Sequence, residues 1–433
     1  MNGTVDVKDV IWWQVYPLGF TGAPIRPDTD AQRAPAHRLR RLIPWLDHMT
    51  DMGFTGLLLG PIFSSTSHGY DTVDHFSIDS RLGDDDDFDA LVRSCHAHGI
   101  RLMLDGVFNH VGSRHPLFLR ALERCREGNG SGDGLFRMRR RDDGGVDYPM
   151  FEGHADLPEL DHDSPAVASL VHDVMEHWMR RGADAWRLDA AYAVAPAFWS
   201  RVIPPVREDF PDSWFLGEVI HGDYAGIVDV SGMDSVTQYE MWKAVWSSLE
   251  SANFYELDWC LKRHDAFLGS FVPQTFIGNH DVTRIASRVG ERMAELAAVV
   301  LFTVGGVPSV YYGDEYAMTG VKEDRFGGDD AIRPAFPDDS ASMGASPDSE
   351  RMLGLYRALV RMRRDRPWLT RAVTAPVSVD NRRYAYDSLE SEEHLSAGSV
   401  SRRSLRVELG LDPAPWARIG EAGHTILAIG PQG

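Results

Sequence analysis

Short runs of β-branched and aromatic residues alternate with amphipathic helical runs along most of this chain of 433 residues. The short runs have the length and composition of buried strands. In chain order they are Val10–Leu18, Gly56–Leu59, Arg101–Val107, Ala185–Asp189, Trp214–Val219, Ser235–Tyr239, Thr275–Ile277 and Ser309–Tyr312. Strands that alternate with helices pair in parallel, and eight such units close into a barrel. The pattern therefore predicts an α/β fold built on a (β/α)8 TIM barrel.

The helical runs between these strands support the same architecture. Apolar residues recur at spacings of three and four over Phe88–Cys95 and over Met352–Leu359, as in a helix with one buried face. Gly53, Gly99 and Gly182 follow helical runs at the position where a glycine commonly ends a helix.

One connection is much longer than the others. Residues 110–163, between the third and fourth predicted strands, are rich in Gly, Arg and Asp and show little periodicity. A loop of that length in a compact protein usually serves a function. We expect these residues to form a subdomain that projects from the barrel, and the basic run Arg137–Arg141 to be a solvated surface of it.

The barrel is predicted to consist of two stretches of chain, with a smaller domain after it. Residues 1–109 form its first part and residues 164–372 its second. Residues 373–433 change to short alternating runs, such as Arg403–Leu409 and Thr425–Ile429, which are typical of strands. They are predicted to form a small C-terminal β-domain.

Charge and composition exclude two classes of partner. The 64 acidic and 44 basic residues give a net charge of −20, which repels nucleic acid and anionic membrane surfaces. Met1–Val10 lacks the apolar core of a secretory signal, and no run approaches the roughly 20 apolar residues of a membrane span. Cys95, Cys125 and Cys260 are too scattered for a zinc site or a disulfide framework. We therefore predict a cytoplasmic protein with no nucleic-acid or membrane partner.

Three acidic residues lie where predicted strands end. Asp189, Glu218 and Asp281 follow the fourth, fifth and seventh strands, and in such a barrel these ends meet at the face that carries the active site. Cleavage of a glycosidic bond needs one carboxylate at the anomeric carbon and one carboxylic acid that protonates the leaving oxygen. The three acids are therefore candidate catalytic residues.

Arg187 lies two residues before Asp189, so both side chains point to the same side of their strand. A cation there is expected to keep Asp189 ionised and to lower its pKa, as a nucleophile requires. Glu218 follows the apolar run Trp214–Leu216 and has no basic residue at the same spacing. It is therefore the better candidate for the acid that keeps a proton near neutral pH.

Each of these residues also has a purely structural interpretation. An acid at a strand end often caps a helix or pairs with a cation, and His110 and His280 are alternatively hydrogen-bonded core residues. This interpretation does not explain why four strand ends carry such groups in order. Asp84–Asp87 precedes a helix, and we predict that it caps that helix rather than binding a metal ion.

Five segments carry a more specific signal. In chain order they are Asp105–His110, Leu157–Asp161, Trp186–Ala191, Leu216–Val219 and Ile277–Asp281. They resemble signature regions of the α-amylase family of glycoside hydrolases (family 13), and the segments Ile11–Pro17 and Tyr70–Asp71 are also similar to that family. The resemblance extends from about residue 10 to about residue 367, and together these motifs are highly specific.

The resemblance implies a role for each catalytic position. Asp189 is implied to be the nucleophile that forms a β-glycosyl enzyme. Glu218 is implied to protonate the leaving sugar and later to activate water. Asp281 is implied to bind sugar hydroxyls and to help distort the ring.

The resemblance also implies substrate-binding residues. His110 and His280 would hydrogen-bond the sugar before the cleaved bond, and Tyr70 would stack beneath that sugar. Arg187 would support the nucleophile, and Asp105 would be a supporting residue near the centre of the site.

Cofactors and specificity are implied less directly. No cofactor is required in the family, but the position of Asn109 often helps to form a calcium site. Many relatives carry Lys-His shortly after the nucleophile, where this chain has Tyr192 and Ala193, so the side that receives the leaving sugar differs here. Ala190 is small, as in relatives that prefer α-1,4 bonds.

We interpret the chain as a retaining hydrolase of the intracellular, oligosaccharide-acting type, whose partner is a linear or cyclic α-1,4-linked gluco-oligosaccharide. The main alternative is a transglycosylase with the same residues, in which a sugar hydroxyl replaces water in the second step. A third alternative is a sugar-binding protein on an inactive barrel. It predicts the loss of at least one catalytic acid, and all three are present.

Overall fold

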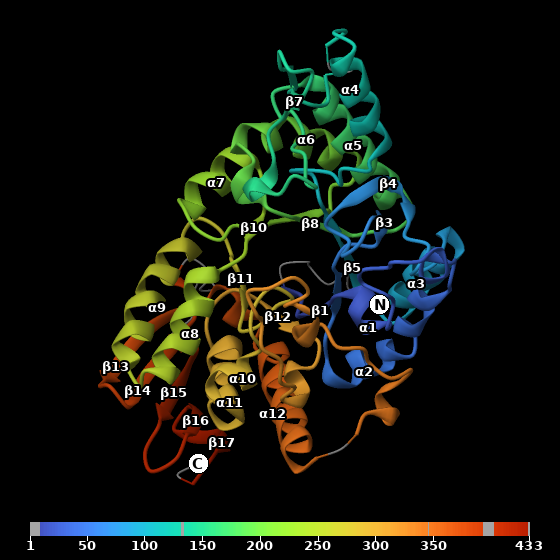
Figure 1. Cartoon of the computed structure of the whole chain (residues 1–433). Helices are drawn as coiled ribbons and strands as arrows, with labels where there is room; N and C mark the ends of the chain where they lie inside the picture. Colours follow the sequence, from blue (N-terminus) through green and yellow to red (C-terminus); the bar gives the residue numbers. More distant parts are fainter. Residues whose placement is uncertain (1–8, 131–133, 345, 393–401, 432–433) are drawn as a thin grey trace.

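Eight parallel strands form a closed sheet in the computed structural model, which describes residues 9–130, 134–344, 346–392 and 402–431 (Figure 1). The strands are β1 (Trp12–Val15), β2 (Gly56–Leu59), β5 (Arg101–Gly106), β8 (Ala185–Leu188), β9 (Trp214–Gly217), β10 (Ser235–Val236), β11 (Gln274–Phe276) and β12 (Val307–Tyr311). Their order is β10-β9-β8-β5-β2-β1-β12-β11, and a parallel bridge between Thr237 and Gln274 joins the two ends. The predicted barrel is confirmed.

Helices surround this sheet. They are α1 (Pro17–Phe20), α2 (Trp45–Met52), α3 (Asp85–Ala97), α5 (Pro165–Arg180), α6 (Pro196–Asp209), α7 (Tyr224–Ser231), α8 (Tyr239–Glu250), α9 (Phe254–Leu268), α10 (Ile285–Val289), α11 (Glu291–Thr303) and α12 (Pro347–Arg364). Gly53, Gly99 and Gly182 have φ of 84°, 68° and 104° just after α2, α3 and α5. These left-handed conformations end the helices as predicted.

Two predicted strands are shorter than expected, because a helix begins inside each predicted range. Pro17 opens α1, where its missing N–H group is not needed. At the sixth strand, the side chain of Gln238 accepts a hydrogen bond from the N–H of Met241, so α8 begins at Tyr239. Tyr239, predicted to be the last residue of a strand, is therefore the first residue of a helix.

Apolar side chains from the early parts of the strands fill the interior of the barrel. Trp12 and Trp214 stack with their ring centroids 6.1 Å apart, and Leu58, Met103 and Val307 belong to the same cluster. This packed layer leaves the opposite, carboxyl ends of the strands for polar side chains.

The inserted segment lies at one end of the molecule (Figure 1). It contains α4 (Pro116–Arg126), a two-stranded sheet of β6 (Arg139–Arg140) and β7 (Val146–Asp147), and a 3-10 turn at Phe151–Gly153. Arg139 is exposed and pairs with Asp147 across this sheet at 2.9 Å, which agrees with the expected solvated surface.

A hairpin after β2 was not predicted. Its strands are β3 (Phe63–Ser65) and β4 (Thr72–Ile78), and they pair antiparallel with irregular register. The strands are short and mix buried with half-buried residues, so their sequence lacks a clean alternation. The connection between them carries Tyr70 to the active-site face.

The last part of the chain forms a five-stranded antiparallel sheet beside α9 and α11. Its strands follow chain order and are β13 (Val373–Val379), β14 (Arg383–Leu389), β15 (Ser404–Gly410), β16 (Trp416–Glu421) and β17 (His424–Ile429). The predicted C-terminal β-domain is therefore present.

Of the stretch Met1–Val10, residues 1–8 lie outside the described residues. In the part of the chain that is described, no helix has the length and apolarity to cross a membrane. The three cysteines are buried and form no disulfide.

Candidate active site

A cleft of about 450 Å³ lies at the carboxyl ends of the barrel strands. Among the residues that line it are Tyr70, His110, Asp189, Ala190, Tyr192, Glu218 and Asp281. Asp105, Arg187 and His280 are almost fully buried and contact the side chains that line the cleft. The structure thus brings together every residue predicted for the catalytic and substrate-binding site.

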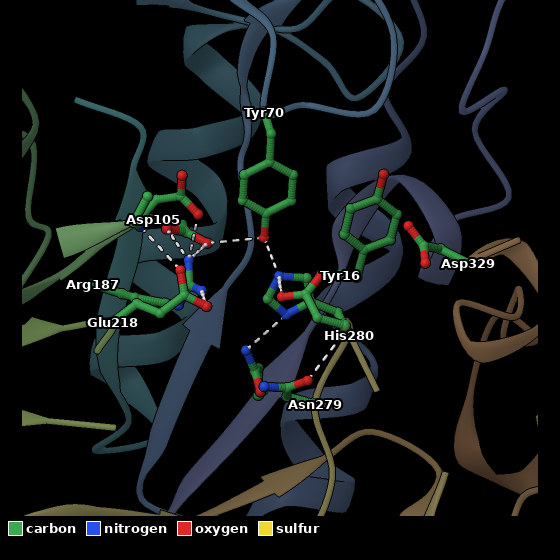
Figure 2. A network of polar contacts seen from close by, with 12 residues as sticks. Tyr16, Tyr70, Asp105, Arg187, Glu218, Asn279, His280 and Asp329 are labelled. Carbon is green, nitrogen blue, oxygen red and sulfur yellow. Dashed lines mark hydrogen bonds and ion pairs between the residues drawn. The ribbon is translucent and has the colours of Figure 1, made fainter. Parts of the chain in front are cut away.

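Arg187 joins the acids at this site (Figure 2). Its Nη1 lies 2.7 Å from both carboxylate oxygens of Asp105 and 3.3 Å from Oδ1 of Asp189, and its Nη2 lies 2.7 Å from Oε1 of Glu218. The side chain of Arg187 is only 3% exposed, so water screens these charges little. One buried cation therefore faces three carboxyl groups.

The direction of the pKa shift of Asp189 differs from the prediction. Burial raises the pKa of Asp189 well above its usual value, the nearby Glu218 raises it further, and Arg187 only partly opposes them. The expected net lowering was therefore wrong, because Arg187 is shared and makes its shorter contacts to Asp105 and Glu218.

Both carboxylate oxygens of Glu218 have fixed hydrogen-bond donors. Oε2 accepts from the backbone N–H of Ala190 at 3.0 Å, and Oε1 accepts from the hydroxyl of Tyr239 at 3.2 Å. Ala190 has a φ of 46°, a left-handed conformation that is strained for a residue with a side chain and that directs its N–H at Glu218. The hydroxyl of Tyr239 in turn accepts from Nδ2 of Asn279 at 2.9 Å.

Asp281 is held as an anion. Burial acts to raise its pKa, but His280 and Arg333 outweigh burial, and the net pKa is lowered. Nε2 of His280 lies 3.0 Å from Oδ2, and Nη2 of Arg333 lies 3.1 Å from Oδ1. The side chain of Asp281 nevertheless remains one third exposed, so it can accept hydrogen bonds from a ligand in the cleft.

Tyr70 and His280 form one face of the site (Figure 2). Their rings are parallel within 3° with centroids 5.4 Å apart, and the Tyr70 hydroxyl contacts Nε2 of His280 and lies 3.2 Å from Oδ2 of Asp105. Nδ1 of His280 lies 3.2 Å from the amide nitrogen of Gln14, which leaves the Nε2 proton for Asp281. Asp105 and His280 therefore hold the hydroxyl of Tyr70, and Tyr70 lines the cleft.

His110 lines the cleft, but protein groups already contact both ring nitrogens. Nε2 lies 3.0 Å from the carbonyl oxygen of Tyr70, and Nδ1 lies 3.2 Å from Nδ2 of Asn109. Burial lowers the pKa of His110 to about 4, so the ring is neutral at neutral pH. Its face stacks on Phe151 of the inserted segment at 4.6 Å.

Asn109, the residue implied for a calcium site, is buried beside His110. Its backbone carbonyl accepts from the N–H of Leu160 at 3.1 Å, and its amide nitrogen faces His110. Calcium takes roughly six to eight oxygen ligands, many of them carboxylates. Among the described residues, one group of three acidic or histidine side chains lies close enough together to share an ion. That group contains no residue near Asn109. Calcium binding therefore remains a prediction.

That group lies instead at the start of α3 and consists of His37, Asp84 and Asp87. Asp84 and Asp87 exchange side-chain and backbone hydrogen bonds in a capping box, and Asp87 also pairs with Arg40 and with His37. These contacts satisfy Asp87 within the protein, which agrees with the predicted role as a helix cap.

Tyr192 forms the rim of the cleft together with the inserted segment. Its hydroxyl donates to Oε1 of Glu152 at 2.8 Å, and its ring lies 6.5 Å from Phe151 and 5.7 Å from His221. Glu152 has a φ of 49°, again a left-handed conformation. Tyr192 therefore places an aromatic ring at the rim of the cleft.

Three residues that hold the acids, Tyr239, Asn279 and Arg333, were not among the predicted site residues, and neither was Glu152, which holds Tyr192. Asn279 had a local signal, because it lies two residues before Asp281 in a signature segment. Arg333 reaches Asp281 from a loop 52 residues away, and no sequence spacing connects them.

The fold and the site define a (β/α)8 barrel with a glycosidase arrangement of carboxyl groups at the ends of its strands. Residues 14–133 and 136–354 match the family described as the α-amylase catalytic domain. The chain therefore belongs to the α-amylase family.

Relatives of known name agree with this assignment. A cyclomaltodextrinase from Bacillus sp is 31% identical over 338 residues, which cover 72% of this chain and 60% of the relative. Neopullulanase 2 from Thermoactinomyces vulgaris is 28% identical over 90% of this chain and 68% of its own length. The chain thus spans less than two thirds of the first of these relatives.

Solved structures show the same fold. The ligand-free cyclic α-maltosyl-(1→6)-maltose hydrolase from Arthrobacter globiformis superposes with a TM-score of 0.78, with 24% identity and 98% coverage of both chains. A structure described as cyclomaltodextrinase has a TM-score of 0.78 and 26% identity, and covers 96% of this chain and 72% of that chain.

Proposed function

We propose that this protein hydrolyses α-1,4-linked gluco-oligosaccharides, linear or cyclic, with retention of the anomeric configuration. The observation that carries the proposal is that one guanidinium group, that of Arg187, contacts both Asp189 and Glu218. Retention needs two carboxyl groups about 5–5.5 Å apart, and a shared guanidinium keeps them close together. The names of the cyclomaltodextrinase and maltogenic amylase relatives support the substrate class.

In the first step, a carboxylate oxygen of Asp189 attacks the anomeric carbon. The bond to the glycosidic oxygen breaks, and that oxygen takes the proton of Glu218, so the leaving sugar departs as an alcohol. This step requires Asp189 to be ionised and Glu218 to carry the proton.

In the second step, the Glu218 carboxylate removes a proton from water, and the water oxygen attacks the anomeric carbon. The bond to Asp189 breaks, which restores its carboxylate and the acid form of Glu218. Asp281, held ionised by His280 and Arg333, accepts hydrogen bonds from sugar hydroxyls.

A second candidate function is transfer to another sugar. It is favoured by the aromatic rim of Tyr192 and Phe151, on which an acceptor ring can stack while water is excluded. In that reaction a sugar hydroxyl replaces water in the second step.

Product analysis tests both functions. We expect maltotriose and cyclodextrins to be cleaved and the new reducing end to appear first as the α-anomer in proton NMR, because two displacements at one carbon restore its configuration. Products longer than the substrate indicate transfer. Isomaltose, cyclic maltosyl-maltose and starch complete the panel, with Asp189→Ala as the inactive control. A β-anomer as first product contradicts the mechanism.

The pH dependence follows from the raised pKa of Asp189. Protonation of Asp189 removes the nucleophile, so activity is lost as the pH falls through that pKa. We therefore expect the acidic limb of kcat/KM to lie above the value of about 4 for an ordinary aspartate. Kinetics on maltotriose from about pH 3 to pH 9 measure the limb, and full activity at the acid end of that range would contradict the raised pKa.

We also propose that the protein acts in the cytoplasm. An intracellular maltogenic amylase from Bacillus subtilis is 28% identical over 72% of this chain. The unpaired, buried cysteines agree with a reducing compartment.

A further inference from the structure

A second and larger cavity adjoins the catalytic cleft, and we call it the side chamber. It has a volume of about 850 Å³ and lies between α8, α10 and the loop of residues 320–329. Five of its lining residues also line the cleft: His154, Asp281, Val282, Lys322 and Asp329. The two spaces therefore meet at Asp281, and a ligand that reaches past this residue enters the chamber.

Aromatic side chains form much of the chamber wall. Trp242 and Trp246 come from successive turns of α8 with ring centroids 5.8 Å apart, and Phe326 projects from the loop opposite with 88% of its surface exposed. The guanidinium of Arg288 on α10 lies 3.8 Å from the Trp246 ring and pairs with Glu250 at 3.2 Å. These contacts fix the tryptophan before a ligand arrives.

Charged and hydroxyl groups complete the lining. They are Thr283, Arg288, Lys322, Glu323, Asp324, Arg325 and Asp329. Both donors and acceptors are therefore present beside the aromatic faces. A pyranose ring offers the matching chemistry, because its C–H faces pack on aromatic rings while its hydroxyl groups both donate and accept hydrogen bonds.

The chamber is also connected to the catalytic acid through α8. Tyr239, the first residue of that helix, hydrogen-bonds Glu218, and its ring packs against Trp242 with centroids 5.8 Å apart. A ligand that packs on Trp242 thus contacts the neighbour of Tyr239, and Tyr239 is the residue that hydrogen-bonds Glu218. Because the two spaces meet at Asp281, a sugar chain can continue from one into the other.

We propose that the side chamber binds glucosyl units of the substrate that lie beyond the units at Asp189 and Glu218. The inference rests on the proposed function, and it predicts a preference for substrates long or curved enough to pass Asp281 into the chamber.

Phe326→Ala is the lead test, because an exposed side chain can be removed without leaving a hole in the core. The ratio of kcat/KM for maltoheptaose to kcat/KM for maltotriose is expected to fall about threefold to tenfold, the value of one aromatic contact. Trp242→Ala is expected to lower the same ratio. The matched control is Trp259→Ala, since Trp259 is 63% exposed on α9 and lines neither space.

A binding experiment separates this proposal from the proposed hydrolysis. Calorimetry measures the Kd of maltoheptaose for Asp189→Asn with and without Phe326→Ala, and the second change is expected to raise Kd by the same factor. If the protein cleaves both sugars but Phe326→Ala leaves the kcat/KM ratio and the Kd unchanged, the proposal that the side chamber binds sugar is contradicted and the proposed hydrolysis is not. Binding that Phe326→Ala weakens, without cleavage in the unaltered protein, supports the chamber and overturns hydrolysis. The absence of both maltoheptaose binding and cleavage would contradict both proposals.

Discussion

Glu218→Gln is expected to lower kcat/KM for maltotriose by about 10³-fold and kcat/KM for α-maltosyl fluoride far less. A sugar leaving group must take a proton from the acid, whereas fluoride leaves as an anion. Asp189→Asn is expected to lower both values by about 10⁴-fold or more, because neither substrate reacts without the nucleophile. Steady-state kinetics on the two substrates measure this difference, since kcat/KM reports the steps up to the glycosyl enzyme.

Both substitutions keep the size of the side chain. In Glu218→Gln only the amide oxygen can accept, so the variant can keep the hydrogen bond from the N–H of Ala190, while its NH2 group can donate to the hydroxyl oxygen of Tyr239. Thermal unfolding checks that the variant folds. Equal losses on both substrates in Glu218→Gln would mean that Glu218 does not donate the proton. Turnover of the fluoride by Asp189→Asn would exclude Asp189 as the nucleophile.

The barrel could be predicted because its strands are buried on both faces and therefore read as apolar runs. Each predicted strand has a counterpart, and the errors lie at the ends, where Pro17 and Gln238 begin helices inside predicted strands. The β3–β4 hairpin was missed for the opposite reason. Its short strands mix buried and half-buried residues and give no clean period.

The acids of the site could be predicted because each follows a strand, and the ends of the strands converge on one face. The residues that contact these acids could not be predicted, because those contacts depend on how loops fold back over that face. Arg333 reaches Asp281 from the loop after β12, and Glu152 reaches Tyr192 from the insertion. The predicted direction of the pKa shift of Asp189 was wrong for the same reason. The sequence places Arg187 beside Asp189 but does not show that Arg187 is shared with two other acids.

Arg187→Met is expected to lower the free energy of unfolding at neutral pH by about 3–5 kcal/mol, the usual cost of leaving buried charges without a partner. Methionine fills much of the same space, but it leaves Asp105, Asp189 and Glu218 without the cation that all three contact. Urea unfolding followed by tryptophan fluorescence measures the loss.

The matched control is Arg263→Met. Arg263 also makes two contacts to one carboxylate, that of Glu240, at 3.0 and 3.1 Å, but its side chain is 45% exposed. Water already screens that pair, so its loss is expected to cost only about 0–1 kcal/mol. Equal losses for the two variants would mean that burial does not strengthen the contacts of Arg187.

The cost of Arg187→Met should also depend on pH, with a sign fixed by the acids. Burial raises the pKa of both Asp105 and Asp189 in the folded protein, and removal of the cation that opposes this effect raises them further. The aspartates of the unfolded chain have pKa values of about 4, so above that pH the folded variant binds more protons than the unfolded chain. The stability of the variant therefore falls as the pH rises from about 4 through the raised pKa values of the folded state. The difference from the unaltered protein should therefore shrink as the pH is lowered from about 7 towards 5. Adding Asp105→Asn, which removes one of the uncompensated charges, should recover part of the loss at neutral pH and less of it at the lower pH.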